Sequence, residues 1–377
     1  MMRETHSRQA SHETEWMRRA LKLARKGTAL VSPNPLVGSV LVREGRSVGE
    51  GFYTYDGKKH AEVKAIEQAG EGARGSVLFV NLEPCCHSGR TGPCTEAILG
   101  AGVRRVVAAM EDPNPLVSGQ GFERLRQAGV EVEVGLCREE AEQLNEAFRK
   151  YIRTGLPLVT LKAALTLDGK IAAPEDNRGW VTSEEARAHV QQQRHAHDAI
   201  LTGIGTVLAD DPLLTDRRGL PRRRPLLRVV MDSRLRMPQT ARMLETVQDD
   251  LLICCSLQTD PAKRRALEER RVQVCALPGE ARPDLCEAMK ELGRREVTSV
   301  LLEAGAELNG AALEAGLVDK VFLYYAPKIL GGRDALPLAG GRGVRAMREA
   351  LPVHRLHHYQ FGPDFAVEGY LRDMDTL

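Results

Sequence analysis

The segment EPCCHSGRTGPC, residues 83–94, holds three cysteines and one histidine, which are four possible metal ligands. Cysteine and histidine are the usual ligands of structural zinc, so the segment could form a closed zinc site by itself. It could also form a disulfide loop, or supply part of a metal site that is completed elsewhere in the chain. The chain has 8 cysteines in 377 residues and a polar N-terminal segment without the apolar core of a signal peptide. These features favour free thiols or metal ligands over disulfides.

A second group with suitable chemistry precedes this segment. His60 and Glu62 of the tripeptide HAE lie at the start of a helix predicted over 60–70, and the next predicted strand leads to Cys85. This arrangement resembles the H-x-E…P-C-x-x-C signature of zinc deaminases, except that eight residues separate Cys85 from Cys94. Consecutive strand–helix units place their helix N-termini at one edge of a sheet, which brings His60 within reach of both cysteines. A helix N-terminus also lowers the pKa of a thiol, which favours the thiolate that zinc requires.

Three protein ligands suit catalysis better than four. A catalytic zinc keeps one position for water and lowers the pKa of that water toward ~7. Glu62 would stay off the metal and carry protons from the water to the substrate ring and the departing amine. Cys86 and His87 would then be loop residues, because neighbouring side chains diverge and seldom bind one ion together. A closed structural site of Cys85, Cys86, His87 and Cys94 is the alternative.

Helices and strands alternate along the first part of the chain, which predicts an α/β sandwich with a largely parallel sheet. A helix over 13–27 follows a flexible tail over 1–12, and the alternating residues 39–52 predict a hairpin that turns near Gly45. A helix over 138–154 closes this part. Further strands are predicted over 75–82, 104–110 and 130–135, and further helices over 60–70, 95–102 and 121–129.

The second part of the chain starts afresh with a strand after residue 156 and again alternates strands with helices. We therefore expect two domains, over 13–156 and 157–377, each within the usual size range. Strands are predicted over 198–202, 226–232, 251–255, 272–276, 298–303 and 319–325, and helices over 183–197, 261–270 and 307–316.

The composition is that of a globular protein without a dominant charge. Hydrophobic residues make up 42% and charged residues 28% of the chain, and the formal net charge is +2. Near-neutral charge and 4% aromatic residues argue against a nucleic-acid track, and the basic run over 217–225 is expected to be a solvated loop. No apolar run reaches the ~18–20 residues of a membrane span. These features predict a cytoplasmic protein with no nucleic-acid partner and no membrane contact.

Four blocks within about 30–121 carry a family resemblance: SPNPLVG, HAEV, EPCCHSGRTGPC and EDPNPLVSGQG. They resemble the deaminase domain of the bifunctional riboflavin-biosynthesis deaminase–reductase family. The resemblance implies a cytidine-deaminase-like α/β/α sandwich. It also implies that His60, Cys85 and Cys94 bind zinc and that Glu62 is the catalytic proton carrier.

Substrate contacts are where the chain departs from the family pattern. The resemblance implies that Asn34 and the 88–92 loop hold the aminopyrimidine and its ribosyl phosphate. The family has histidine where this chain has Tyr53, and histidine or asparagine where it has Lys64. It has serine where this chain has Cys86. The first two departures bear on substrate binding, whereas the metal chemistry is preserved.

The second half resembles the reductase domain of the same family over most of 160–332. The blocks are KAALTLDGKIA, GWVTSEEAR, DAILTGIGTVLADDPLLTDR, RVVMDS and LLEAGAELNGAALEAGLVDKVFLYYAPKILGG. They imply a dihydrofolate-reductase-like α/β fold that uses NADPH. The family has serine where this chain has Arg178. The positions implied to contact NADPH are Ala164, Trp180, Thr206, Asp210 and the 305–311 loop with Gly305 and Ala306, and those implied to contact substrate are Arg194, Leu214, Arg217 and Glu303.

Residue chemistry agrees with part of this assignment. The segments TGIGT and EAGAELNG are small-residue loops after strands, where backbone N–H groups can approach phosphates. Arg194 and Arg217 suit bidentate contact with a ribosyl phosphate. Taken alone, these features also fit ordinary strand–helix turns, surface arginines and, for Trp180, a core aromatic residue.

The resemblance implies two consecutive reactions on a small-molecule ribosylaminopyrimidine phosphate. The first is zinc-dependent hydrolytic deamination of 2,5-diamino-6-ribosylamino-4(3H)-pyrimidinone 5′-phosphate. The second is NADPH-dependent reduction of the ribosyl side chain to ribityl. A homo-oligomer is also implied. Two other hypotheses stay open on the sequence alone: a zinc deaminase of another aminopyrimidine or a nucleic-acid base, and a non-catalytic ligand sensor stabilised by zinc.

Overall fold

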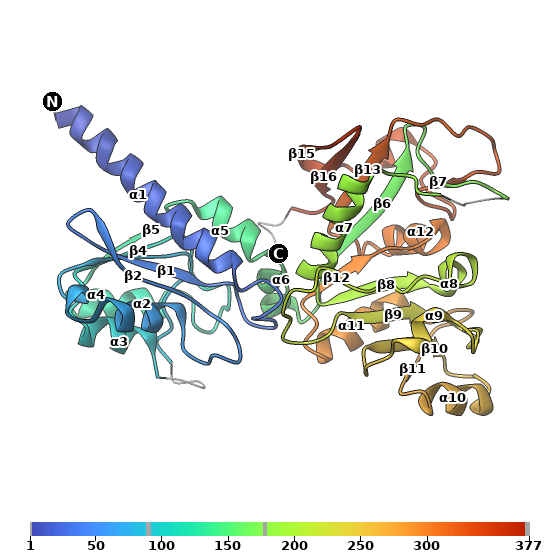
Figure 1. Ribbon diagram of the computed structural model, residues 1–377, viewed down its shortest axis with the longest axis horizontal. Coiled ribbons are helices and arrows are strands. Elements are labelled where there is room, and N and C mark those ends of the chain that lie inside the picture. The colour runs from blue at the N-terminus through green and yellow to red at the C-terminus, as the bar shows by residue number, and fades with distance from the viewer. Residues whose placement is uncertain (1, 88–91, 176–178, 374–377) are drawn as a thin grey trace. The chain divides into compact units, whose positions relative to one another are not determined.

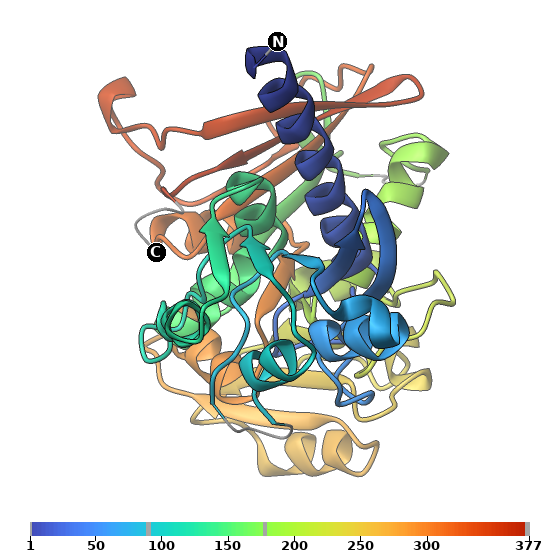
Figure 2. The ribbon, with the colours of Figure 1, turned by 90° about the vertical axis from the view of Figure 1, so that its left-hand side faces the viewer.

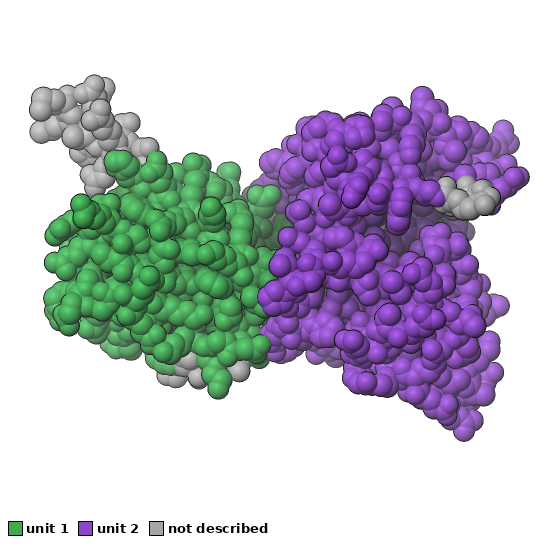
Figure 3. Space-filling view, viewed as in Figure 1, with its two compact units in different colours: residues 1–154 green, residues 155–377 purple. Residues whose placement is uncertain are grey.

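The structure, a computed structural model, describes residues 2–87, 92–175 and 179–373 and divides into two compact units. The units cover residues 1–154 and 155–377, drawn in green and purple in Figure 3. Each unit has its own main sheet and its own apolar core. No helix in the described part of the chain is long and apolar enough to cross a membrane.

The first unit is a five-stranded mixed sheet with helices on both faces (Figure 1). Its strands are β1 (Gly38–Arg43), β2 (Arg46–Phe52), β3 (Val77–Val80), β4 (Arg105–Ala108) and β5 (Glu131–Val134). Its helices are α1 (Met2–Arg25), α2 (Ala61–Ala69), the short 3-10 helix η1 (Gly70–Ala73), α3 (Cys94–Gly100), α4 (Gln120–Gln127), α5 (Arg138–Leu144) and α6 (Glu146–Thr154). The strand order is β2-β1-β3-β4-β5, with β1 antiparallel to both neighbours and β3, β4 and β5 parallel.

Alternation along the central strands builds two apolar layers, because successive side chains of a strand point to opposite faces. Val40 and Phe79 belong to the layer that includes Met17 of α1. Leu41 and Leu78 belong to the layer packed against α2, α3 and α4. Figures 1 and 2 show α1 on one side of the sheet and α2 on the other. This is the sandwich that the sequence predicts, and it places the N-termini of α2 and α3 side by side.

Two helix boundaries differ from the sequence prediction. The first helix begins at Met2 rather than near residue 13, because residues 2–25 contain neither glycine nor proline and nothing in the local sequence stops the helix. The helix expected over 138–154 is two helices, α5 and α6, that break at Asn145. The Asn145 side chain accepts a hydrogen bond from the backbone N–H of Leu36 at 2.8 Å and donates to its carbonyl at 3.0 Å. This distant contact fixes the break.

The second unit is a nine-stranded sheet in the order β11-β10-β9-β8-β12-β6-β13-β16-β15, with a small β14-β7 pair beside it. Its strands are β6 (Leu158–Thr166), β7 (Lys170–Ala172), β8 (Ala199–Gly203), β9 (Leu227–Met231), β10 (Leu251–Ser256), β11 (Gln273–Leu277), β12 (Ser299–Leu302), β13 (Lys320–Ala326), β14 (Leu336–Pro337), β15 (His354–Phe361) and β16 (Asp364–Tyr370). Its helices are α7 (Glu184–Ala196), α8 (Ile204–Asp210), α9 (Arg242–Glu245), α10 (Pro261–Glu268), α11 (Leu285–Arg294), α12 (Ala306–Glu314) and the 3-10 helix η2 (Met347–Glu349).

Seven strands of this sheet run parallel, and the β15–β16 hairpin adds an antiparallel edge. Helices α11 and α12 pack on one face of the sheet, and α8, α9 and α10 pack on the other. Parallel strands covered on both faces read as continuous apolar runs, as LLICC in β10 does. The loops after β6, β8, β12 and β13 meet at the carboxyl edge of the sheet, where open α/β sheets bind ligands.

The basic run over 217–225 is only partly a solvated loop, which corrects the expectation from the sequence. Arg222 is 12% exposed and donates to the carbonyls of His195 and His197 at 2.7 Å, at the C-terminus of α7. Asp216 lies 3.3 Å from the same guanidinium. A cation at the last carbonyls of a helix satisfies them and complements the helix dipole. Arg222 therefore holds the end of α7.

Candidate functional sites

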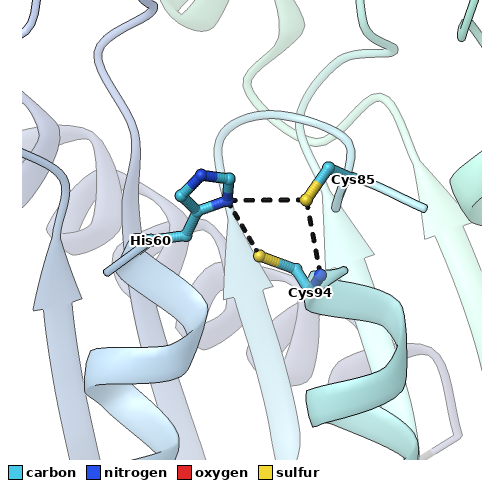
Figure 4. A group of neighbouring side chains, drawn as sticks. All are labelled: His60, Cys85 and Cys94. Atoms are coloured by element: carbon cyan, nitrogen blue, oxygen red, sulfur yellow. Dashed lines mark hydrogen bonds between the residues drawn. The ribbon is translucent and has the colours of Figure 1, made fainter. Parts of the chain in front are cut away.

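The ends of two helices and one strand bring three metal-ligating side chains together. His60 caps the N-terminus of α2, Cys85 lies in the loop after β3, and Cys94 opens α3. The Nδ1 atom of His60 lies 3.1 Å from Sγ of Cys94 and 3.5 Å from Sγ of Cys85 (Figure 4). All three ligand atoms lie within 4.8 Å of one another. The structure thus brings together the three zinc ligands predicted from the sequence.

The separation of 3.5 Å between His60 and Cys85 matches one tetrahedral zinc ion, and that of 3.1 Å between His60 and Cys94 is somewhat shorter. With Zn–S near 2.3 Å and Zn–N near 2.0 Å, neighbouring ligand atoms of a tetrahedral site are about 3.5–3.8 Å apart. Among the described residues, the metal-ligating group of His60, Cys85 and Cys94 includes neither Cys86 nor His87. The Sγ atom of Cys86 instead lies 4.0 Å from Oε1 of Gln120. A site with three protein ligands keeps a position for water, which is the catalytic rather than the structural arrangement.

The two ligand thiols differ in acidity. A hydrogen bond from Cys94, aided by His60 and by the backbone N–H of Cys94 at 3.3 Å, lowers the pKa of Cys85 to about 4. The same hydrogen bond to Cys85 and burial raise the pKa of Cys94. The lowered pKa of Cys85 favours the thiolate form that binds a metal.

Glu62 lies in the first turn of α2 and is 3% exposed. Burial raises the pKa of its carboxyl, while the nearby His60 opposes that rise. The Oε2 atom is buried and has no hydrogen-bond partner in the part of the chain that the structure describes. A buried oxygen without a partner is costly unless a ligand or water completes it. Such a carboxylate beside a metal site suits proton transfer.

Glu83 anchors the loop that carries the first cysteine ligand, a role that the sequence analysis missed. Its Oε2 accepts hydrogen bonds from the backbone N–H groups of Asp112 at 3.0 Å and Gly119 at 2.9 Å. Its Oε1 accepts from the N–H of Gly121 at 2.8 Å. Glu83 is 5% exposed. The motif EPC is visible in the sequence, but the donors lie about thirty residues away and no local pattern identifies them.

A small pocket adjoins Cys85 on the side of this loop. It is lined by Glu83, Pro84, Cys85, Cys86, His87, Asp112, Val117 and Gly121. Burial raises the pKa of the Asp112 carboxyl at its wall. The 88–92 loop predicted to hold substrate lies outside the described residues except for Gly92, and Arg178 also lies outside them.

Asn34 approaches the metal-ligating group through Tyr53. Its Nδ2 donates to the Tyr53 hydroxyl at 2.8 Å, and the Tyr53 ring lies edge-on to the His60 ring with centroids 5.4 Å apart. Lys64, the other departure from the family pattern, donates to the backbone carbonyl of Phe52 at 2.9 Å. Tyr53 and Lys64, at which the chain departs from the family pattern, therefore both lie at the segment that borders the metal site.

In the second unit, Glu303 joins three elements beside the carboxyl edge of the sheet. Arg194 of α7 holds both carboxylate oxygens, with distances of 2.9 Å to Oε1 and 3.0 Å to Oε2. Lys162 of β6 lies 3.4 Å from Oε2. Burial alone would raise the pKa of the Glu303 carboxyl, but Lys162 and Arg194 lower it to about 2. Lys162 was not singled out from the sequence, although it lies in the block KAALTLDGK.

The remaining predicted positions are only partly brought together. Gly305 is the N-cap residue of α12 and Ala306 is its first residue, so the expected 305–311 loop is mostly helix. The Thr206 hydroxyl faces Gly305. Ala164 lies on β6 two residues after Lys162, on the same face of the strand.

Four other predicted positions lie outside this group. Asp210 and Arg217 are exposed, and Leu214 is 5% exposed in the apolar core. Trp180 is 66% exposed, with the Arg187 guanidinium 4.8 Å from its ring centroid, so the core alternative for Trp180 is wrong.

Comparison with known proteins decides the family. Residues 157–367 match the model of the RibD C-terminal domain, and residues 10–110 match the cytidine and deoxycytidylate deaminase zinc-binding region. The chain is 42% identical over 361 residues to riboflavin biosynthesis protein RibD of Escherichia coli, covering 93% of this chain and 96% of that protein. It belongs to the RibD family. The RibD protein of Actinobacillus pleuropneumoniae is 40% identical over 357 residues, covering 94% of each chain.

Solved RibD structures share the whole architecture. Acinetobacter baumannii RibD superposes with a TM-score of 0.85 and 36% identity, covering 96% of this chain and 99% of that chain. The Thermotoga maritima protein, described as a diaminohydroxyphosphoribosylaminopyrimidine deaminase and 5-amino-6-(5-phosphoribosylamino)uracil reductase, gives 0.84 and 34% with the same coverage.

Membership of the RibD family confirms four expectations. The first unit is a zinc-binding deaminase domain with a cytidine-deaminase-like fold, and the second is an NADPH-dependent reductase domain with a dihydrofolate-reductase-like fold. The chain is a bifunctional enzyme, a hydrolase and an oxidoreductase. Its pathway is riboflavin biosynthesis.

Proposed function

We propose that the first unit removes the ring amine of 2,5-diamino-6-ribosylamino-4(3H)-pyrimidinone 5′-phosphate and that the second unit then reduces the ribosyl side chain with NADPH. The observation that carries this proposal is the pairing of a three-ligand metal group with a buried carboxylate. His60, Cys85 and Cys94 lie within ligand distance of one another, and Glu62 has a buried oxygen without a partner among the described residues. A structural zinc site would need neither an open position nor that carboxylate.

In the deaminase unit, each side chain has a separate task. His60, Cys85 and Cys94 would hold the zinc, which would lower the pKa of a bound water. Glu62 is placed to take up a proton on its carboxylate and to pass protons to the ring nitrogen and to the amine, which leaves as ammonia. Asn34 and the neighbouring loop orient the aminopyrimidine so that its amino-bearing carbon meets the nucleophile. Positioning of this kind accounts for much of the rate in enclosed sites.

In the reductase unit, NADPH would supply the hydride for C1′ of the sugar, and the residues of the chain supply position and charge. Small residues at the start of α12 and beside it let backbone groups approach the cofactor. These residues are Gly305, Ala306 and Thr206. Arg194 uses three of its N–H groups on Glu303 and on the Thr215 carbonyl. Two further N–H groups of its guanidinium have no acceptor among the described residues and can bind the substrate phosphate.

The other expected contacts complete the proposed pocket. Ala164, Trp180 and Asp210 border the cofactor, and Leu214 and Arg217 border the substrate. Glu303 is likewise expected to border the substrate. The cytoplasmic location predicted from the composition and the homo-oligomeric assembly implied by the family resemblance both stay predictions.

Product analysis tests this proposal directly. The purified zinc-loaded chain is given the diaminopyrimidine ribotide with and without NADPH, and the products are followed by mass spectrometry. The expected result is the deaminated ribotide without NADPH and the ribityl product only with NADPH. Unchanged substrate in both reactions would contradict the proposal, and so would reduction that precedes deamination.

A further inference from the structure

Tyr53 connects a metal ligand to a predicted substrate contact. It lies in the loop after β2 and is 6% exposed. Its hydroxyl accepts a hydrogen bond from Nδ2 of Asn34 at 2.8 Å. Its ring meets the His60 ring at an interplanar angle of 86° with centroids 5.4 Å apart. One side chain therefore touches both the metal-ligating group and the amide that we assign to the aminopyrimidine.

The backbone around Tyr53 is held from several directions. Its N–H donates to the carbonyl of Val37 at 2.9 Å, and the N–H of Tyr55 donates to the carbonyl of Leu30 at 3.0 Å. Lys64 of α2 donates to the carbonyl of Phe52, directly before Tyr53, at 2.9 Å. The position of the Tyr53 hydroxyl is thus set by β2, by α2 and by the segment before β1.

The backbone around Asn34 is equally fixed, whereas its amide depends on Tyr53. The Asn34 N–H donates to the carbonyl of Val31 at 2.9 Å, and Asn145 holds both backbone groups of Leu36. The one hydrogen bond that the structure gives to the Asn34 amide among the described residues is the bond to Tyr53. In the orientation that the structure gives, Nδ2 donates to the Tyr53 hydroxyl, which leaves Oδ1 for another donor. Tyr53 therefore holds the amide in this orientation.

We propose that Tyr53 is a positioning residue of the deaminase site that orients the Asn34 amide so that its Oδ1 accepts a hydrogen bond from an amino or ring N–H group of the aminopyrimidine. This inference rests on the proposed function of the first unit. Tyr53 acts through Asn34 and does not itself contact substrate. A neutral hydroxyl is suited to this role, because it offers an acceptor to the amide without adding a charge beside the zinc ligands.

The variant Tyr53→Phe removes the hydroxyl and keeps the ring against His60. Loss of an orienting hydrogen bond of about 1 kcal/mol or somewhat more should raise the KM for the diaminopyrimidine ribotide by about five- to twentyfold. The kcat should stay within about threefold, since the bond serves binding rather than proton transfer. Bound zinc, measured per chain, should equal that of the wild type. The matched control is Tyr55→Phe, which removes a second hydroxyl of the same loop and should leave both constants unchanged.

A double-variant cycle separates positioning from direct contact. Once Asn34→Ala has removed the amide, Tyr53→Phe should cost nothing more, so the double variant should match Asn34→Ala in KM. Additive losses would overturn the proposal, because Tyr53 would then contact substrate independently. Loss of zinc in Tyr53→Phe would also overturn it, since the role would be structural. If the wild type deaminates the ribotide and Tyr53→Phe behaves identically, only this inference fails. If the wild type does not deaminate it, the proposed function fails as well.

Discussion

Arg194 and Glu303 form a bidentate ion pair inside the second unit, with N···O distances of 2.9 and 3.0 Å and side chains that are each 11% exposed. The partners come from α7 and from the residue after β12, which are more than one hundred residues apart in the chain. Paired charges that are removed from water depend strongly on one another, so loss of one partner leaves the other uncompensated.

This ion pair predicts a specific dependence of stability on pH. The folded-state pKa of Glu303 is about 2, below its ordinary value, so the stabilising effect is complete above pH ~4.5 and is lost as the pH falls toward 2. The lowered pKa of Glu303 corresponds to a contribution of about 3 kcal/mol to the free energy of unfolding at neutral pH. The wild type should therefore exceed Glu303→Gln in free energy of unfolding at pH 7, and the gap should shrink between pH ~4.5 and ~2. Urea unfolding at a series of pH values measures it, and a constant gap would contradict the assignment.

The adjacent cysteines should behave differently toward zinc. Cys85→Ser and Cys94→Ser each remove one of three protein ligands, whereas Cys86→Ser removes a thiol outside the ligating group. We expect the first two variants to lose most of their zinc after dialysis against a mild chelator, and Cys86→Ser to retain one zinc per chain. Metal analysis of the purified variants is the measurement. Zinc loss in Cys86→Ser comparable with that in Cys94→Ser would contradict this prediction and support the alternative of a closed structural zinc site.

Removing the Glu83 charge should disturb the zinc site without touching a ligand. Glu83→Gln keeps one acceptor oxygen but turns an NH₂ group toward backbone N–H donors that the carboxylate now satisfies. Loss of buried hydrogen bonds to a charged group should lower the free energy of unfolding by about 2–3 kcal/mol. Zinc binding should weaken by about ten- to a hundredfold. Denaturant unfolding and zinc titration against a competing chelator measure the two effects.

A surface glutamate supplies the control for this variant. Glu96 pairs with Arg124 and is 53% exposed, so Glu96→Gln should change stability by less than about 1 kcal/mol. Equal losses in the two variants would show that the charge of Glu83 has no special role.

Sequence patterns predicted most of the fold and the metal ligands because both depend on local order along the chain. The hairpin turn could be predicted from Gly45, which has φ +72° in the structure. His60 and Cys94 each mark the start of a helix, so alternating strands and helices suffice to bring them to one edge of the sheet.

Features set by distant contacts could not be predicted in this way. The break between α5 and α6 depends on Asn145 bonding to Leu36, and the burial of Arg222 depends on the carbonyls at the end of α7. The β15–β16 hairpin also escaped prediction, since its edge strand is exposed and rich in polar residues and so lacks the apolar alternation of a half-buried strand.

The division of labour between the two units is tested most directly with Glu62→Gln. The zinc-loaded variant and the wild type are each given NADPH with either the diaminopyrimidine ribotide or the deaminated ribotide, and products are quantified by mass spectrometry. We expect the variant to retain zinc and to release ammonia from the first substrate at about a hundredth of the wild-type rate or less. We expect it to reduce the second substrate at the wild-type rate. Deamination at the wild-type rate by the variant, or an equal loss of the reductase step, would contradict this division of labour.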